Sequence, residues 1–283
     1  WWGEGTPKYD DNPAMNLGIK PNQKIVEQEW VNLKNSLLSL PFSLEIVPFP
    51  KLLDSNSPCN WKHDYIFMRD LFISNQNNDV VIARFKEKER QAEEEIIERW
   101  LRKQNLNVHV LPFNKNYSME GGEFYFCKQE NILFAGVGRN NSIANKKTAE
   151  LLNVCELIQL ETNAFHLDTI FTPVINNENK LCLIICCKDL MNKNSFDKLK
   201  KLSNILGIEI LNISPKDAIG TPNKLGSFAV NCLPLPGYLI NAAQFTSKNV
   251  MAALKSHKIN YVKVPLTQFH LSGGSAHCLT NEL

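Results

Sequence analysis

Residues 88–104 read "KERQAEEEIIERWLRKQ", and residues 108–113 read "VHVLPF". In the first stretch, apolar residues recur at three- and four-residue spacing between charged ones, which predicts an amphipathic helix with one buried face. The second stretch is a short apolar run typical of a strand. A helix followed closely by a strand is therefore the unit to look for in the rest of the chain.

This helix–strand unit occurs five times in all. The other four pairs lie at 23–40 and 42–49, 145–153 and 155–161, 196–206 and 208–214, and 247–257 and 261–266. Between them, polar or glycine-containing turns join strand pairs that predict hairpins. These pairs are 64–74 with 80–85, 123–127 with 132–138, 168–175 with 181–187, and 227–233 with 238–243. The repeats predict one α/β domain, residues 1–283, with five-fold pseudosymmetry.

Composition narrows the class of protein. The chain has 283 residues, of which 43% are hydrophobic and 21% charged, and this suits a globular protein with a sizeable core. The formal net charge is +2 without a basic stripe or an acidic tail, so we expect no nucleic-acid partner. The apolar stretches are shorter than a bilayer, so we expect a soluble protein without a membrane partner. The chain has neither an initiator Met nor a recognisable signal segment, and a cytoplasmic location is expected.

Eight cysteines are present, without a CxxC pair: Cys59, Cys127, Cys155, Cys182, Cys186, Cys187, Cys232 and Cys278. Four of them lie in strand-like runs, so we expect reduced, mostly buried thiols and no cysteine metal site. Cys278 differs because it follows Ser-Gly-Gly-Ser at 272–275, where backbone can approach a ligand closely. It is therefore a candidate nucleophile.

Polar segments recur near corresponding ends of the repeats. In a closed cyclic arrangement these ends would converge and bring together Asp70, Glu120, His166, Asp168 and Cys278. A thiol becomes a strong nucleophile when it ionises, and a neighbouring imidazolium favours its ionisation. Several carboxylates in one pocket suit a planar cation such as a guanidinium. The segments are "HDYIFMRD" (63–70), "MEGGEF" (119–124), "AFHLDT" (164–169) and "SGGSAHC" (272–278).

The motifs "FMRD", "EGGE", "FHLDT" and "GGSAHCLT" together resemble the guanidine-modifying pentein superfamily. That superfamily includes arginine deiminases, dimethylarginine dimethylaminohydrolases, arginine dihydrolases and amidinotransferases. The resemblance extends over nearly the whole chain in motif order and spacing. It implies a five-bladed α/β propeller, which agrees with the number of repeats.

The resemblance also implies catalytic roles. Cys278 would attack the guanidino carbon and form a covalent thiouronium intermediate. His166 would protonate the departing amine and then activate water, and Glu120 would orient and polarise His166. On its own, each of these residues is also compatible with a structural role.

Substrate-binding roles follow in the same way. Asp70 and Asp168 match the carboxylates that hold the guanidinium nitrogens, and Asp64 matches an acid near the substrate. Arg90 matches an arginine near the amino-acid end of the substrate, although a solvated position at a charged helix start stays open. Asn12, in "NPAM" at 12–15, matches an arginine dihydrolase residue near the ligand.

Three positions depart from the family patterns. Dimethylargininases carry a second carboxylate where this chain has Arg69, and arginine dihydrolases have Asn where it has Asp70. The arginine expected after "GxGx" is displaced, so that either Arg139 or Asn140 could take its role. His277 is expected to be structural.

We therefore predict a hydrolase of the guanidino group of arginine or methylated arginine, yielding a ureido product such as citrulline. No metal or organic cofactor is expected, since side chains supply all the chemistry, and a homodimer stays open. Two alternatives remain: an amidinotransferase, and a non-catalytic pentein that binds a partner. The combined Cys, His and Asp set argues against the second alternative.

Overall fold

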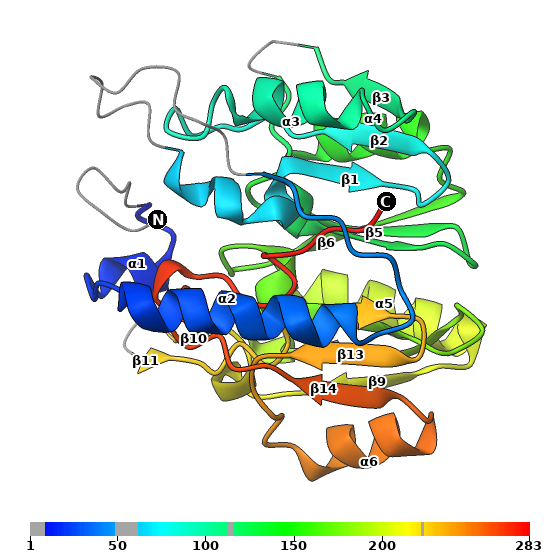
Figure 1. Ribbon diagram of the computed structural model, residues 1–283. Helices are drawn as coiled ribbons and strands as arrows, with labels where there is room; N and C mark the ends of the chain where they lie inside the picture. Colours follow the sequence, from blue (N-terminus) through cyan, green and yellow to red (C-terminus); the bar gives the residue numbers. More distant parts are fainter. Residues whose placement is uncertain (1–8, 49–61, 113–115, 222–223) are drawn as a thin grey trace.

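The computed structural model describes residues 9–48, 62–112, 116–221 and 224–283, and it has a mixed α/β fold (Figure 1). The α-helices are α1 (Pro13–Asn16), α2 (Gln23–Leu38), α3 (Glu93–Leu101), α4 (Ser142–Leu151), α5 (Lys193–Leu206) and α6 (Lys248–Ser256). The strands of the first half are β1 (Phe72–Ser74), β2 (Asp79–Ile82), β3 (Asn107–Val110), β4 (Phe124–Cys127), β5 (Ile132–Val137) and β6 (Glu156–Glu161). Those of the second half are β7 (Phe171–Ile175), β8 (Leu181–Cys186), β9 (Glu209–Asn212), β10 (Gly220–Thr221), β11 (Lys224–Leu225), β12 (Leu233–Leu235), β13 (Tyr238–Asn241) and β14 (Asn260–Lys263).

Four three-stranded sheets share one topology. Each consists of an antiparallel hairpin and a third strand that pairs parallel to the second strand of that hairpin. The sheets are β1-β2-β3, β4-β5-β6, β7-β8-β9 and β12-β13-β14. A parallel third strand needs a crossover, and α3, α4, α5 and α6 supply one to each sheet in turn. Four of the predicted helix–strand units are thereby confirmed.

The fifth predicted unit is incomplete. Helix α2 forms, but residues 43–48 after it have no strand assignment, so the predicted strand at 42–49 is wrong over its described part. The only further sheet in the described ranges is the two-stranded β10-β11. The mixed α/β class is confirmed, whereas closure into a five-bladed propeller stays a prediction.

Three predicted boundaries are also wrong, and at two of them a residue with positive φ turns the backbone. The helix expected from residue 88 begins at Glu93, after Ala92 in the left-handed region with φ 75°. The strand expected at 64–74 is two 3-10 turns followed by β1. The strand expected at 227–233 is mostly a turn, with Phe228 at φ 54°, and β12 begins only at Leu233.

The core follows the apolar strands. Strand β8 is buried along its whole length and carries Cys182 and Cys186, with Cys187 next to it, as the sequence predicted. None of the seven cysteines within the described ranges forms a disulfide, and Cys59 lies outside those ranges. Among the described helices, none combines the length and apolar character that crossing a bilayer requires.

Short turns lead into the first strand of each sheet and pack against one another. The 3-10 turn Met68–Leu71 precedes β1, Gly121–Glu123 precedes β4, and Leu167–Thr169 precedes β7. The first of these packs on the second, and the second on the third. This packing brings polar residues from distant parts of the sequence to one place.

Candidate active site

A small cavity lies where these turns meet the segment after the 3-10 helix Phe269–Ser272. Its volume is about 20 Å³, roughly the space of one water molecule, so a larger ligand enters only if lining side chains move. The cavity is lined by Tyr9, Asn12, Met15, Asp64, Phe67, Asp70, Arg90, Arg139, Phe165, His166, Ser272, Gly273, Gly274 and Cys278. Seven of the nine predicted site residues are therefore in its wall.

The Cys278 thiol is buried, with 4% of the residue exposed. Its Sγ donates to Asp168 Oδ2 at 3.3 Å and accepts from the Asn231 side-chain amide at 3.1 Å. Burial raises the pKa of Cys278 well above its usual value, and the negative charges of Asp168 and Asp70 raise it further. The thiol is therefore neutral in the empty cavity, and a bound cation would favour its ionisation.

His166 is held by two carboxylates. Its Nε2 lies 3.0 Å from Glu120 Oε2, and its Nδ1 lies 3.7 Å from Asp70 Oδ1. Burial alone would lower the pKa of His166, but Asp70 and the bond to Glu120 raise it to about 9. For Glu120 the effects are reversed. Burial alone would raise the pKa of Glu120, but Arg139 and His166 hold it well below its usual range. The pair is thus an imidazolium on a carboxylate at neutral pH.

The paired glycines of "EGGE" allow this close packing. A Cβ on Gly122 would lie 2.6 Å from Asp70 Oδ1 and 2.7 Å from His166 Nδ1. A Cβ on Gly121 would lie 1.9 Å from the Arg69 carbonyl oxygen. Only glycine at both positions lets the turns before β1, β4 and β7 meet.

Arg90 is buried in the cavity wall, and the solvated alternative is wrong because carboxylates neutralise its guanidinium from several sides. Its Nη1 lies 2.6 Å from Asp70 Oδ2, its Nη2 lies 2.9 Å from Glu93 Oε2, and 3% of the residue is exposed. Asp70 Oδ2 is therefore occupied. Within the described ranges, Asp70 Oδ1 is buried and has no hydrogen-bond partner, as is true of Asp168 Oδ1.

Of Arg139 and Asn140, only Arg139 lines the cavity. Its Nη1 lies 3.2 Å from Glu120 Oε1, its Nη2 lies 2.7 Å from Asp11 Oδ1, and its guanidinium stacks 4.1 Å from the Phe165 ring centre. Asn140 lies behind this layer, where its Oδ1 accepts from the Glu120 backbone N–H at 2.6 Å. The shift by one residue thus still places an arginine beside the cavity.

The segment before α1 forms another wall of the cavity. The Tyr9 hydroxyl donates to Asp64 Oδ2 at 2.7 Å, and burial raises the pKa of Asp64. Asn12 donates to the Ser272 carbonyl at 3.1 Å, and its Oδ1 caps α1. Both side chains line the cavity, and each is partly engaged in holding its wall together.

Arg69 points away from the cavity. Its Nη1 pairs with Glu282 Oε2 at 2.5 Å, and its Nε lies 3.5 Å from the His277 carbonyl. The position where dimethylargininases carry a second carboxylate therefore contributes no side chain to this cavity.

Donor atoms of Asp70, Glu120 and His166 lie within 4.8 Å of one another, close enough for a shared metal ion. Arg90 already pairs with Asp70, and Arg139 with Glu120. The two guanidinium charges disfavour a metal ion at this place.

Sequence reasoning missed Asn231. It lies two residues before β12, as Asp70 lies two residues before β1, and the apolar context "SFAVNCL" concealed it. The repeat register is the signal that could have found it. His277, which was expected to be structural, is buried and lies with Nδ1 2.8 Å from Asp168 Oδ2. Burial lowers the pKa of His277 well below its usual value, so the neutral ring donates to Asp168.

Residues 51–283 match the family described as "N,N dimethylarginine dimethylhydrolase, eukaryotic". The chain belongs to this family. Membership in the dimethylarginine dimethylhydrolase family confirms the predicted relation to the guanidine-modifying penteins.

The chain also has two curated cyanobacterial relatives. Both are named bifunctional arginine dihydrolase/ornithine cyclodeaminase. AgrE of Nostoc sp. is 29% identical over 280 residues, which are 96% of this chain and 35% of AgrE. ArgZ of Synechocystis sp. is 26% identical over 277 residues, with the same coverage of both chains. The chain thus spans about a third of the length of these relatives.

Solved structures show the same fold. Unliganded AgrE has a TM-score of 0.78 at 24% identity, covering 96% of this chain and 37% of that one. A dimethylarginine dimethylaminohydrolase adduct with 4-chloro-2-hydroxymethylpyridine has a TM-score of 0.70 at 15% identity, covering 96% and 95%.

Proposed function

We propose that the protein is a cysteine-dependent hydrolase of the guanidino group of arginine or an Nω-methylated arginine. The single observation that carries this proposal is the buried Cys278 thiol beside Asp70 and Asp168, each of which has one buried oxygen without a hydrogen-bond partner. Unpaired buried carboxylate oxygens are costly, and a guanidinium offers them planar, charge-assisted N–H donors. On this proposal, residues 1–283 act as one pentein domain.

Substrate binding prepares the nucleophile. The empty site keeps the thiol protonated because burial and nearby carboxylates raise the pKa of Cys278. A guanidinium between Asp70 and Asp168 cancels their negative charge, and the thiol then releases its proton to solvent. The resulting thiolate attacks the guanidino carbon and forms a C–S bond.

His166 then moves two protons in turn. Protonated at neutral pH, with a pKa of about 9, it gives its proton to the leaving nitrogen as the C–N bond breaks. The neutral imidazole next takes a proton from water, and the hydroxide adds to the thiouronium carbon. The C–S bond breaks as the ureido C=O forms, and the departing thiolate takes up the hydroxyl proton, which restores the thiol. The products are a ureido compound and ammonia or a methylamine.

Relatives support the reaction class. The family name denotes hydrolysis of dimethylarginine, and the two curated relatives are named arginine dihydrolases. A structure of a variant of AgrE contains L-arginine. Both substrate types remain candidates for this protein.

The test is product analysis by mass spectrometry, with arginine and asymmetric dimethylarginine supplied separately. We expect citrulline with ammonia or with dimethylamine, and no product from the Cys278→Ser variant. Arginine plus glycine or ornithine tests the transferase alternative. A guanidino product formed at the expense of citrulline would replace our proposal with amidino transfer.

A further inference from the structure

Asn231 makes an unusual set of contacts around the nucleophile. Its Nδ2 donates to Cys278 Sγ at 3.1 Å and lies 3.2 Å from the Asp168 carbonyl oxygen. Its Oδ1 accepts from the Cys278 backbone N–H at 3.3 Å, and its own carbonyl accepts from the His277 N–H at 3.3 Å. One fully buried amide therefore touches both the backbone and the reacting sulfur of Cys278.

We propose that Asn231 is a further catalytic residue, whose side-chain amide stabilises the Cys278 thiolate and aims it at the guanidino carbon. This inference rests on the proposed function for the identity of the electrophile. Its own basis is the geometry around the sulfur, which does not depend on the substrate.

The surroundings of the sulfur explain why such a donor is needed. Asp168 and Asp70 oppose a negative charge on Sγ, whereas Asn231 and the Ser275 backbone lower the pKa of Cys278. His166, Arg90 and Arg139 line the same cavity, and neutral His277 is engaged with Asp168. When the thiolate forms, the bond from the thiol to Asp168 is lost, but the amide of Asn231 remains a donor. Hydrogen bonds to a charged acceptor are roughly twice as strong as neutral ones, so this contact favours the ionised form.

The fold fixes the amide in place. Asn231 ends the turn that starts at Phe228, where φ is 54°, and its N–H donates to the Phe228 carbonyl at 3.1 Å. Asn241 in β13 holds the same turn, because its Nδ2 donates to the Ala229 carbonyl at 2.7 Å. Asn241 thus supports the turn by a contact with Ala229, whereas Asn231 touches the sulfur. The chain thereby offers a matched control.

The experiment measures Cys278 alkylation by iodoacetamide as a function of pH, with peptide mass spectrometry to separate this site from the other cysteines. Iodoacetamide is neutral and needs no guanidinium site. Asn231→Asp keeps the shape and the acceptor for the Cys278 N–H, but places a carboxylate where the donor was. We expect the alkylation midpoint to move up by about one pH unit or more, so that alkylation at neutral pH slows roughly tenfold. Asn231→Ala should shift in the same direction, and Asn241→Ala, which loosens the turn but keeps the donor to the sulfur, should shift the midpoint less.

Turnover provides the second readout. The Asn231 variants should lose kcat with KM near the wild-type value, because the amide acts on the sulfur and not on the substrate cation. An unchanged midpoint in Asn231→Asp, or an equal shift in Asn241→Ala, would overturn the inference. If the wild type hydrolyses no guanidine but the Asn231 variants still shift the midpoint, the proposed substrate fails while the thiolate role stands. If it hydrolyses arginine and the variants behave as wild type, the Asn231 role alone fails.

Discussion

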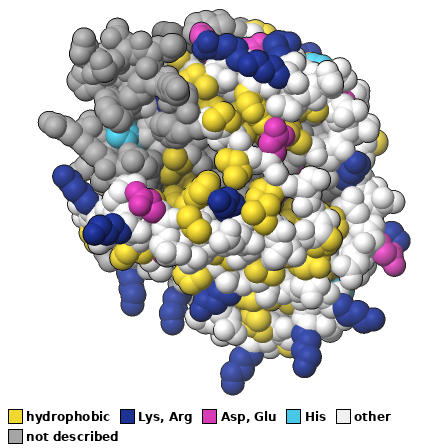
Figure 2. Space-filling model, viewed as in Figure 1, with side chains coloured by type: hydrophobic (Ala, Val, Ile, Leu, Met, Phe, Trp, Pro, Cys, Tyr) yellow, Lys and Arg dark blue, Asp and Glu magenta, His cyan; other side chains and the backbone are white. Residues whose placement is uncertain are grey.

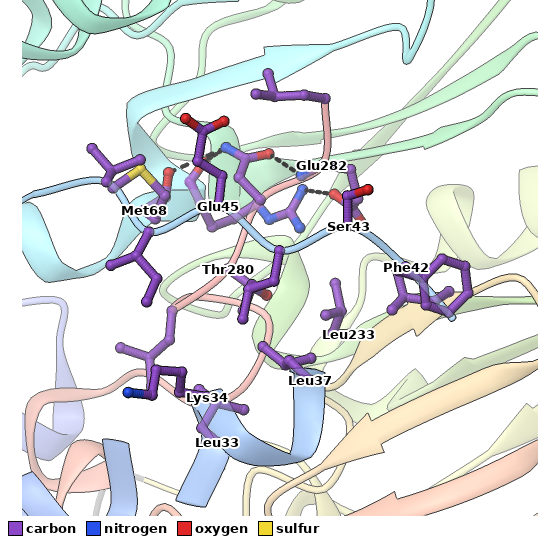
Figure 3. Close-up of a pocket in the computed structure, with 18 of the residues that line it drawn as sticks. Leu33, Lys34, Leu37, Phe42, Ser43, Glu45, Met68, Leu233, Thr280 and Glu282 are labelled. Carbon is purple, nitrogen blue, oxygen red and sulfur yellow. Dashed lines mark hydrogen bonds and ion pairs between the residues drawn. The ribbon is translucent and has the colours of Figure 1, made fainter. Parts of the chain in front are cut away.

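Two hollows formed by the described residues differ in size and in the chemistry of their walls. The cavity around Cys278 measures about 20 Å³, and its wall includes the buried groups of Asp70, Arg90, Arg139 and His166, with Arg90 paired to Asp70. The second hollow, which we call the apolar groove, measures about 1260 Å³ and lies along α2, residues 42–48 and residues 279–283. Figure 2 shows hydrophobic side chains gathered on this face above α2. In Figure 3, Leu33 and Leu37 of α2 lie below Thr280, with Met68 and Leu233 farther around the wall.

The larger of the two hollows is not the one with reactive side chains. The groove is large, and its wall is mostly apolar, with Arg69 and Glu282 already paired to each other. The cavity is small, yet a thiol, an imidazolium and carboxylate oxygens without hydrogen bonds lie in or directly behind its wall. Reactive side chains, rather than volume, identify the candidate site, and the groove should matter to stability alone.

The largest expected difference concerns two buried cysteines. Cys278→Ser should abolish turnover, because serine in this setting is a far weaker nucleophile, while removing little apolar volume. Cys186→Ser, at the buried last residue of β8, should keep turnover but lower the melting temperature, because an unpaired buried hydroxyl costs about 1–3 kcal/mol. Steady-state kinetics and thermal unfolding of both variants check this. Full activity in Cys278→Ser would remove the thiol from the mechanism.

Two buried carboxylates give the next contrast. Asp70→Asn should lower kcat/KM about thirtyfold, since losing a charge-assisted hydrogen bond to the substrate costs about 2 kcal/mol. Asp217 is also buried, but its carboxylate accepts from the Thr246 N–H and hydroxyl and does not line the cavity. Asp217→Asn should lose stability and retain kcat/KM. Wild-type kcat/KM in Asp70→Asn would refute its role in binding.

A smaller effect is expected from pH. Burial raises the pKa of Asp168 to about 7, so its carboxylate is charged and able to bind a cation only above that pH. His166 is a proton donor only below its pKa of about 9. The profile of kcat/KM should therefore rise through about pH 7 and fall above about pH 9. Because Asp168 and His166 interact electrostatically, the two apparent pKa values of this profile belong to the coupled groups together. An activity that is already maximal at pH 5 would contradict this assignment.

The groove supplies the smallest expected effect on activity. Leu37, 8% exposed, packs in the cluster that includes Leu233 and Ile240, so Leu37→Ala should cost about 2 kcal/mol or more of unfolding free energy. The adjacent Leu38 is 58% exposed, and Leu38→Ala should change stability little. Both variants should keep kcat/KM near wild type. Denaturant unfolding and steady-state assays check the pair, and a large kcat loss in Leu37→Ala would link the groove to catalysis.

Several elements could be predicted because their signals are local. The spacing in residues 93–101 and 193–206 and the apolar runs of β5 and β8 reveal helix and strand without reference to the rest of the chain. Two other features could not be predicted in this way: the lack of a strand at 43–48 after α2, and the turn that replaces a strand before β12. Whether a short apolar run becomes a strand depends on a partner edge, and the sequence does not display that edge.

The sequence by itself determined which residues are the candidates for the proposed chemistry. The motifs around Asp70, Glu120, His166 and Cys278 stand at corresponding positions of repeated units, and their residue types already suit a guanidinium and a thiol nucleophile. Only the tertiary structure decided how they share charge: that Arg90 occupies one oxygen of Asp70, and that Asn231 reaches the sulfur. The physical reason is that pKa values and hydrogen bonds depend on distance and burial, which arise only when segments far apart in the chain are packed together.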